Sequence, residues 1–194
     1  MNLRAKSKWV IGLTGSMLSG KSTALAYFVA CGADVLSCDD IVRELRERPA
    51  VLKKIKSALG TADRAQLAQL VFTNATKRKT LENILHPLLL KEVRARIKRS
   101  KCPVVVLEAP LLFEAGWDKY TDLNIVVLAD PKTLPARLKE RKLTRAEYNR
   151  RTKYQLPDLQ KAQRGDIVFF HATKVQLKKS VERFCSVLEV LPHQ

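Results

Sequence analysis

Five short apolar runs alternate along the chain with stretches whose apolar residues recur every three or four positions. The runs cover residues 9–11, 33–38, 102–107, 123–129 and 166–170. Runs of this length and composition are typical of buried strands, and the spacing between them is typical of helices. Alternating strands and helices predict an α/β fold with three layers, in which helices cover a five-stranded parallel sheet.

Residues 49–99 break this alternation, because they have a helical pattern and no convincing strand. About fifty residues are too many for a simple crossover between two strands. We therefore predict a helical insertion at 49–99 within a core made of 1–48 and 100–194. In a two-substrate enzyme, such an insertion could form the wall of the site on the acceptor side. Pro87 lies inside the apolar stripe of this region, so we expect a kink or break near His86. The stripe consists of Leu81, Ile84, Leu85, Leu88, Leu89, Val93 and Ile97.

The first apolar run leads into a phosphate-binding pattern. Residues 15–22 read Gly-Ser-Met-Leu-Ser-Gly-Lys-Ser and fit G-x-x-x-x-G-K-[ST]. Backbone N–H groups of such a loop, with the dipole of the following helix, converge on an anion. Lys21 can reach the terminal phosphates of ATP, and the Ser22 hydroxyl can bind Mg²⁺. The predicted nucleotide-binding residues here are Gly15, Leu18, Ser19, Gly20, Lys21, Ser22 and Thr23.

The alternative for this pattern is a chance match in a turn rich in glycine and serine. The apolar run before it and the helix-compatible residues 23–30 after it supply the context that a phosphate loop requires. Ser16 and Leu18 are unusual, because small residues are expected there; they could alter the shape of the loop without abolishing its amide cradle.

Acidic residues follow two of the predicted strands. Asp39 and Asp40 come directly after 33–38, and Glu108 follows 102–107. Ligands of open parallel sheets bind at the carboxyl ends of the strands, so these side chains are expected near the phosphates. Asp39 could deprotonate or orient an attacking hydroxyl, or hold a metal through water. Alternatively it caps a helix over 40–48, and both roles can hold together.

Residues 137–164 are densely basic. One interpretation is a solvated pair of helices. The other, which we favour beside a phosphate loop, is a lid over about 137–165 that closes on ATP and presents guanidinium groups to the transferring phosphoryl group. The cations are Arg137, Lys139, Arg141, Lys142, Arg145, Arg150, Arg151, Lys153, Lys161 and Arg164. A last amphipathic helix follows, with its apolar face formed by Leu177, Val181, Phe184, Cys185 and Leu188.

Composition limits the classes of function. The 194 residues are 46% hydrophobic, enough for one domain with a small insertion, and no apolar run approaches the ~20 residues of a membrane span. The net charge of +17 attracts polyanions. Without an aromatic-interleaved basic tract, a nucleotide-switched nucleic-acid-binding protein is only the second hypothesis. The four cysteines form no C-x-x-C pair, which favours reduced thiols in a cytoplasmic protein over a zinc site.

Beyond the loop, several strings resemble those of the dephospho-coenzyme A kinase family over nearly the whole chain. The most specific are Pro110-Leu-Leu-Phe-Glu114 and the lid signature Arg151-x-x-x-Gln155-Leu-Pro, followed by Lys161 and Asp166. The others are Ser37-Cys38-Asp39-Asp40-Ile41-Val42-Arg43, His86-Pro87 and Arg141. The chain departs from the family pattern at Ser37, where the family has aspartate, at His171, where it has asparagine, and in a glycine-poorer phosphate loop.

The resemblance implies a kinase that uses ATP with Mg²⁺ and phosphorylates the ribose 3′-hydroxyl of dephospho-coenzyme A. It implies that Asp39 is the base, that Lys21 and Arg141 assist catalysis, and that Arg151 contacts the nucleotide. The residues it implies for the acceptor are Asp39, Arg43, His86, Pro110, Leu111 and Glu114. We expect a monomer or weak homo-oligomer. Another nucleoside monophosphate or small-molecule kinase on the same scaffold is the nearest alternative.

Overall fold

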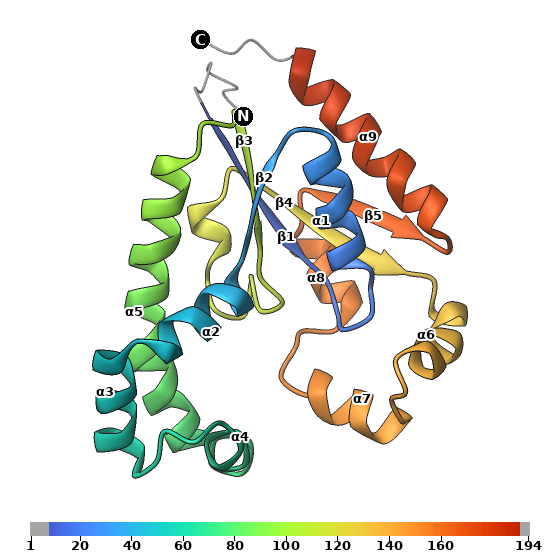
Figure 1. The fold of residues 1–194 in the computed structure, drawn as a ribbon. Helices are drawn as coiled ribbons and strands as arrows, with labels where there is room; N and C mark the ends of the chain where they lie inside the picture. Colours follow the sequence, from blue (N-terminus) through green and yellow to red (C-terminus); the bar gives the residue numbers. More distant parts are fainter. Residues whose placement is uncertain (1–7, 191–194) are drawn as a thin grey trace. The chain divides into compact units, whose positions relative to one another are not determined.

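The computed structural model describes residues 8–190 of the chain, which form two compact units (Figure 1). The core unit contains the described residues up to 35 and from 100 onward, and the helical unit contains residues 36–99. This division assigns 36–48 to the helical unit, whereas the sequence suggested a boundary at 48. Each unit is considered by itself below.

The sheet has the strand order β2-β3-β1-β4-β5. Its strands are β1 (Trp9–Thr14), β2 (Asp34–Ser37), β3 (Val104–Glu108), β4 (Leu123–Ala129) and β5 (Ile167–His171). β1 pairs in parallel with β3 and β4, and β4 pairs in parallel with β5. The α/β class and the five strands are thus as the sequence predicted, with small shifts at the strand ends. Their carboxyl ends carry the loops described below.

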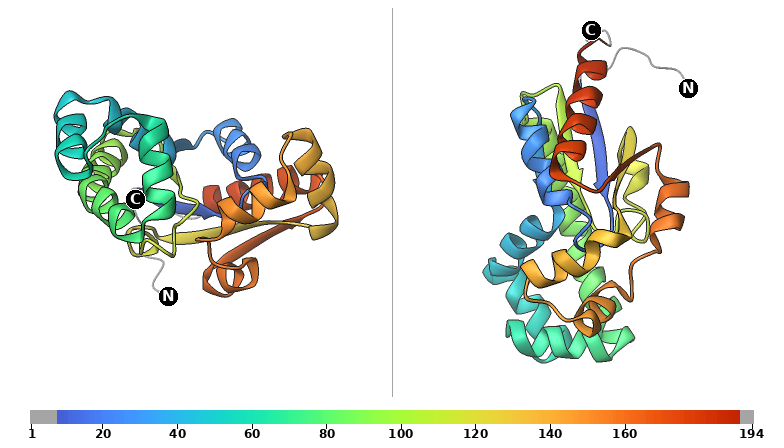
Figure 2. Two further views of the ribbon diagram at one scale, coloured as in Figure 1. Left: turned by 90° about the horizontal axis from the view of Figure 1, so that it is seen from below. Right: turned by 90° about the vertical axis from the view of Figure 1, so that its right-hand side faces the viewer.

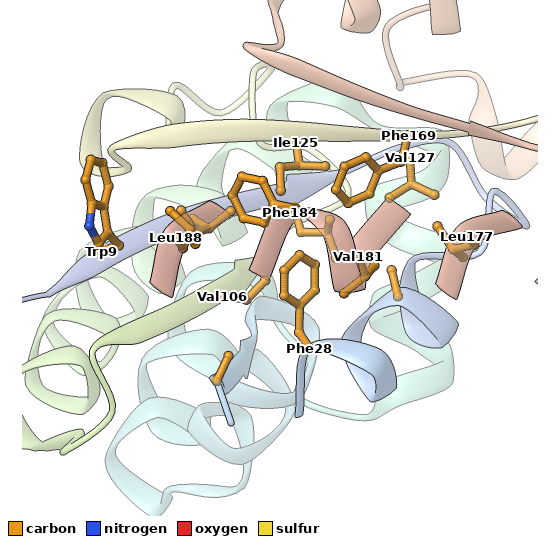
Figure 3. Packing of buried hydrophobic residues seen from close by; sticks show 14 residues of the cluster. Trp9, Phe28, Val106, Ile125, Val127, Phe169, Leu177, Val181, Phe184 and Leu188 are labelled. Carbon is orange, nitrogen blue, oxygen red and sulfur yellow. The ribbon is translucent and has the colours of Figure 1, made fainter. Parts of the chain in front are cut away.

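Helices cover both faces of the sheet in the core unit. Figure 2 shows α1 (Lys21–Ala30) and α9 (Lys174–Val190) on one face and α8 (Asp158–Arg164) on the other. The main apolar core lies between the sheet and the helices α1 and α9 (Figure 3). Phe184 stands at its centre, with edge-to-face contacts to Phe28 at 6.0 Å and Phe169 at 6.1 Å between ring centroids. The apolar face predicted for the last helix therefore packs where its spacing indicated.

The connection from β4 to β5 contains the densely basic segment 137–164. It contains η2 (Pro131–Thr133), α6 (Leu134–Glu140), α7 (Arg145–Thr152) and α8, while η1 (Asp118–Tyr120) precedes β4. α7 begins with a capping box, in which Thr144 accepts from the Glu147 amide and Glu147 accepts from the Thr144 amide. The segment expected to be a lid is thus helical.

The helical unit consists of α2 (Cys38–Glu47), α3 (Pro49–Leu59), α4 (Arg64–Thr73) and α5 (Ala75–Arg99). Its own apolar core contains Val51, Ile55, Leu59, Leu67 and Leu85. The region predicted as a helical insertion is helical apart from the short connections at 60–63 and 74. Over residues 8–190 of the chain, no helix has both the length and the apolar character that crossing a membrane requires.

Of the kink or break expected near His86, the break does not occur, and the kink stays a prediction. α5 runs for 25 residues with Pro87 inside it. Proline lacks one amide donor and crowds the preceding turn. Leu85, Leu89 and Val93 are buried on either side of it, so the packed stripe continues across the proline and keeps the helix whole.

The helix cap predicted at Asp39 is also corrected. α2 begins at Cys38, and Ser37 is its N-cap, with its hydroxyl accepting from the Asp40 amide at 3.4 Å. Serine is among the preferred N-cap residues, because its short side chain reaches the amides of the first turn. Asp39 is instead an exposed residue within that first turn.

A chain of ion pairs joins the helices of this unit. Arg96 of α5 pairs with Glu44 of α2 and, at 3.1 Å, with Glu92 of its own helix, while Arg48 pairs with Glu92 at 2.9 Å. Hydrogen bonds from Arg96 to Glu44, and from Arg48 and Arg96 to Glu92, hold the pKa of both carboxyl groups below the ordinary value of 4.5. The unfolded chain therefore binds more protons than the folded protein in this acidic range.

We predict that these pairs stabilise the protein at neutral pH and lose that contribution in acid. Stability rises with pH wherever the unfolded state binds more protons, so the contribution is complete above about pH 5 and disappears as the pH falls through the depressed carboxyl pKa values. In denaturant titrations, Arg96→Met should lower the free energy of unfolding by about 1 kcal/mol at pH 7. The deficit should shrink below pH 4.5.

The matched control is Lys98→Met, which removes an exposed cation from the same helix. It should change stability little at either pH. A deficit for Arg96→Met that stays constant from pH 7 down to acid would contradict the prediction, because it would reflect lost packing rather than lost charge pairing.

Candidate active site

The phosphate loop connects the buried end of β1 to the first turn of α1. Its backbone takes left-handed values at Leu18, with φ +65°, and at Gly20, with φ +102°. A turn within the loop is closed by the Ser19 amide, which donates to the Ser16 carbonyl at 3.1 Å. Gly20 is the N-cap of α1. The first amides of α1 follow it directly, and they have no hydrogen-bond acceptor within the helix.

Two glycines of the loop have no room for a side chain. A Cβ atom on Gly15 would lie 2.3 Å from the Val127 carbonyl oxygen, and one on Gly20 would lie 2.9 Å from a ring nitrogen of His171. The first and sixth positions of the pattern are therefore glycine for a steric reason. Leu18 takes its left-handed conformation with a side chain, at a cost of about 1–2 kcal/mol.

Side chains from three elements hold the carbonyl groups of the loop. Lys21 Nζ donates to the carbonyls of Gly15 at 2.8 Å and Ser16 at 3.1 Å. Arg137 Nη1, from α6, donates to the Leu18 carbonyl at 2.8 Å. His171 Nε2, at the end of β5, lies 2.8 Å from the Ser19 carbonyl.

The segment at the start of α8 contacts the same loop. The Ser16 hydroxyl donates to the Asp158 carboxylate, and the Met17 amide donates to Gln155 Oε1 at 3.3 Å. Ser16, which the sequence marked as unusual, thus makes a hydrogen bond that a glycine at this position could not make. Gln155 and Asp158 belong to the end of the predicted lid, so this end is attached to the phosphate loop.

A buried ion pair attaches the lid end to the loop after β3. Lys161 of α8 is fully buried; its Nζ lies 3.1 Å from Glu114 Oε1 and donates to the Pro110 carbonyl at 2.6 Å. The same Glu114 oxygen accepts from the Leu156 amide at 2.7 Å, and among residues 8–190 its Oε2 has no hydrogen-bond partner. The Thr14 hydroxyl also donates to the Pro110 carbonyl at 3.4 Å.

This geometry shows that Lys161 differs from the other cations of the predicted lid. The sequence grouped it with side chains offered to a phosphoryl group, but it is enclosed and paired with Glu114. A buried charge needs a partner and further hydrogen bonds, and Glu114 and Pro110 supply them. Periodicity did not distinguish Lys161 from its exposed neighbours, because a charged residue is usually solvated.

The other predicted residues fall into four groups. Gly15 to Thr23 are brought together as the loop and helix start, and Pro110 and Glu114 lie beside the end of the lid. Arg141 follows α6 and Arg151 lies near the end of α7, and both are exposed. Asp39, Arg43 and His86 belong to the helical unit, where Arg43 pairs with Asp40 at 2.7 Å and His86 is exposed.

Sequence reasoning did not assign Arg137, Gln155, Asp158 and His171 to the phosphate loop. Arg137 had been grouped with the lid cations, and Gln155 had been noted only as part of the lid signature. His171 had been marked as a departure from the family pattern, which was the one signal available for it. Their contacts with the loop span 119 to 152 positions, so no local pattern could reveal them.

Solved structures share the fold of this chain. A crystal structure from Thermus thermophilus has a TM-score of 0.85 and 31% sequence identity, covering 96% of this chain and all of the other. Dephospho-CoA kinase from Campylobacter jejuni has a TM-score of 0.65 at 23% identity, covering 92% of this chain and 98% of its own; that likeness concerns the fold.

The parallel sheet, the phosphate loop after its first strand and the basic helices before its last strand define a P-loop kinase. The family model for dephospho-CoA kinase matches residues 9–176. The curated dephospho-CoA kinase of Fusobacterium nucleatum is 32% identical over 92% of this chain and 98% of its own. That of Geobacter metallireducens is 39% identical over 82% and 86%. The chain belongs to the dephospho-CoA kinase family.

We predict that the Lys161–Glu114 pair is needed for stability. Lys161→Met removes one partner of a buried pair and leaves the Glu114 carboxylate without its cation, which costs about 3–5 kcal/mol. Denaturant unfolding should show this loss. The double variant Lys161→Met with Glu114→Gln should be more stable than Lys161→Met alone, because the amide oxygen can still accept from Leu156 without a buried charge.

Lys139→Met, which removes an exposed cation from α6, is the control and should unfold like the parent protein. Equal stability of Lys161→Met and Lys139→Met would show that the ion pair contributes nothing.

Proposed function

We propose that this protein transfers the γ-phosphoryl group of ATP to the ribose 3′-hydroxyl of dephospho-coenzyme A, giving coenzyme A and ADP. The observation that carries the proposal is the family match over residues 9–176, which includes a phosphate loop built with the backbone that such a loop needs. The remainder of this section assigns roles to residues of this chain.

The phosphates of ATP fit the loop between β1 and α1. Its left-handed turn at Gly20 presents the first amides of α1 to an anion, and the helix dipole favours negative charge there. Lys21, bonded to the Gly15 and Ser16 carbonyls, is at hand to bind the β- and γ-phosphates. Ser19 Oγ is buried and, among residues 8–190, has no hydrogen-bond partner, so it is a further group that a bound nucleotide could satisfy.

Mg²⁺ fits the same helix start. Ser22 follows Lys21 and is exposed, so its hydroxyl could be the one protein ligand of an ion held mainly by phosphate oxygens and water. When bound, Mg²⁺ would offset the charge that develops on the phosphate oxygens.

The acceptor side is assigned to residues of the helical unit and the loop after β3. Asp39, in the first turn of α2, would orient or deprotonate the 3′-hydroxyl, and Arg43 and His86 would bind the acceptor. Arg43 is half exposed in its pair with Asp40, so a phosphate of the acceptor could compete for it without desolvating a buried pair. Pro110, Leu111 and Glu114 would complete the acceptor site.

Arg141 and Arg151 are assigned to the charge that builds up during transfer. Both are exposed in the connection between β4 and β5, so their guanidinium groups are accessible to a ligand. Guanidinium groups placed on developing phosphoryl charge stabilise the transition state more than the ground state.

The experiment that tests the function is a coupled ADP-release assay with a panel of acceptors. ADP release should depend on dephospho-coenzyme A and should be slow with nucleoside monophosphates, shikimate or no acceptor. Release that prefers another acceptor would assign a different kinase activity, and salt-resistant nucleic-acid binding without ADP release would favour the nucleotide-switch alternative.

We predict that Asp39→Asn lowers kcat at least a hundredfold, while ATP binding stays within about twofold of the parent. General-base catalysis contributes about 10²–10⁴-fold to rate, and the amide keeps the size of the side chain but cannot take the proton. Steady-state kinetics and calorimetric ATP binding measure the two effects separately.

Glu47→Gln neutralises an exposed carboxylate at the other end of α2 and should keep the parent kcat. If Asp39→Asn turns over like Glu47→Gln, Asp39 takes no part in the chemistry.

A further inference from the structure

We propose that His171 is a positioning residue for the phosphate loop: its ring holds the Ser19 carbonyl and thereby aims the next amide of the loop, that of Gly20, at the bound phosphates. The proposal rests on the function proposed above, since it concerns the binding of ATP. It assigns a role to a residue at which this chain departs from the family pattern.

His171 is fixed by the sheet. It is the last residue of β5, where it pairs with Ala129 of β4, and its carbonyl accepts from the Asp130 amide at 2.8 Å. The side chain is only 2% exposed. The ring therefore projects from a rigid strand end, at the edge of the sheet where β1 passes into the phosphate loop.

The hydrogen bond determines which ring nitrogen carries the proton. A carbonyl oxygen can only accept, so Nε2, 2.8 Å from the Ser19 oxygen, must be the donor. Among residues 8–190, Nδ1 is buried without a hydrogen-bond partner. Within the described chain, the Ser19 carbonyl is therefore the one polar group that orients this ring.

Holding this carbonyl fixes the direction of an amide. The Ser19 carbonyl and the Gly20 N–H belong to one planar trans peptide, in which the two groups point in opposite directions. With the oxygen directed at the ring, the Gly20 N–H points away from it. Gly20 is the N-cap of α1, so its amide begins the series that meets a phosphate.

The ring also explains the glycine beside it. A Cβ atom on Gly20 would lie 2.9 Å from His171 Nε2, and φ at Gly20 is +102°. The ring that bonds to the Ser19 carbonyl thus also packs against Gly20, on the same side of the peptide between them. No side chain at position 20 is compatible with this packing.

His171 differs from the other side chains that hold the loop. Lys21 bonds to loop carbonyls but is also the residue expected to move to the phosphates. The bond from His171 is buried at both ends, because Ser19 is only 4% exposed. A bond enclosed in this way persists whether or not nucleotide is bound, so it can preorganise the loop before binding.

The test compares variants of equal size with and without a donor. His171→Leu removes the donor and leaves the buried Ser19 oxygen unpaired. His171→Gln keeps an N–H donor the same number of bonds from the backbone. Phe170→Thr is the control, because Phe170 precedes His171 on β5 and is 59% exposed, so its side chain lies on the other face of the strand.

ATP binding is measured by calorimetry in the absence of acceptor, followed by kcat and KM for each substrate. His171→Leu should weaken ATP binding about three- to tenfold, the loss that one hydrogen bond accounts for. KM for ATP should rise with it, while KM for dephospho-coenzyme A stays unchanged. His171→Gln should recover binding to within about twofold, and Phe170→Thr should bind ATP like the parent.

A spectroscopic measurement on the parent protein accompanies these variants. Nitrogen NMR of the imidazole rings should show a proton on Nε2 of His171, both free and with ATP; the missing signal in His171→Gln assigns it among the three histidines. A proton on Nδ1 instead would overturn the proposal. Parental ATP affinity in His171→Leu would overturn it, as would equal losses in His171→Leu and His171→Gln.

These results separate the proposal from the function on which it rests. If the parent protein binds ATP and the variants behave as expected, but dephospho-coenzyme A is not phosphorylated, the acceptor assignment fails and the role of His171 stands. If the parent phosphorylates dephospho-coenzyme A and the donor at position 171 does not affect ATP binding, the role of His171 fails and the function stands.

Discussion

The phosphate loop must hold its carbonyl groups away from the anion that its helix start is to bind, and the core unit meets this constraint with side chains from three elements. Lys21, Arg137 and His171 bond to the carbonyls of the loop. An isolated peptide of this sequence has no such partners and would lose the conformation, because left-handed residues are unfavourable outside glycine. The fold makes the loop possible because α1, α6 and β5 bring these side chains to the end of β1.

Contacts of this kind also involve the two loop positions at which small residues were expected, Ser16 and Leu18. Leu18 is held in a left-handed conformation with its carbonyl bonded to a guanidinium group, and the Ser16 hydroxyl is bonded to Asp158. Hydrogen bonds that involve a charged group are stronger than neutral ones. Such contacts can offset the strain of a leucine at this position, so replacing small residues in the loop does not dismantle it.

The end of the lid is part of the same structure. Gln155 and Asp158 contact the loop, Leu156 bonds to Glu114, and Lys161 lies buried against Glu114 and Pro110. These bonds place the string from Pro110 to Glu114 between the end of β1 and the start of α8. A change in the lid end therefore reaches the phosphate loop through two routes, and the stability and function of this region are linked.

The sequence by itself determined the strands, the helices and the phosphate loop, because each depends on neighbouring residues: apolar alternation, helical spacing, and a glycine pattern between a strand and a helix. It also carried the strings that the dephospho-CoA kinase family shares. The sequence offered Asp39 as the cap of α2, whereas Ser37 forms it through a local bond to the Asp40 amide. Tertiary structure alone decided that α5 continues through Pro87 and that Lys161 is buried. It also paired His171 with Ser19, 152 positions away, because burial and long-range hydrogen bonds arise only when separate elements pack.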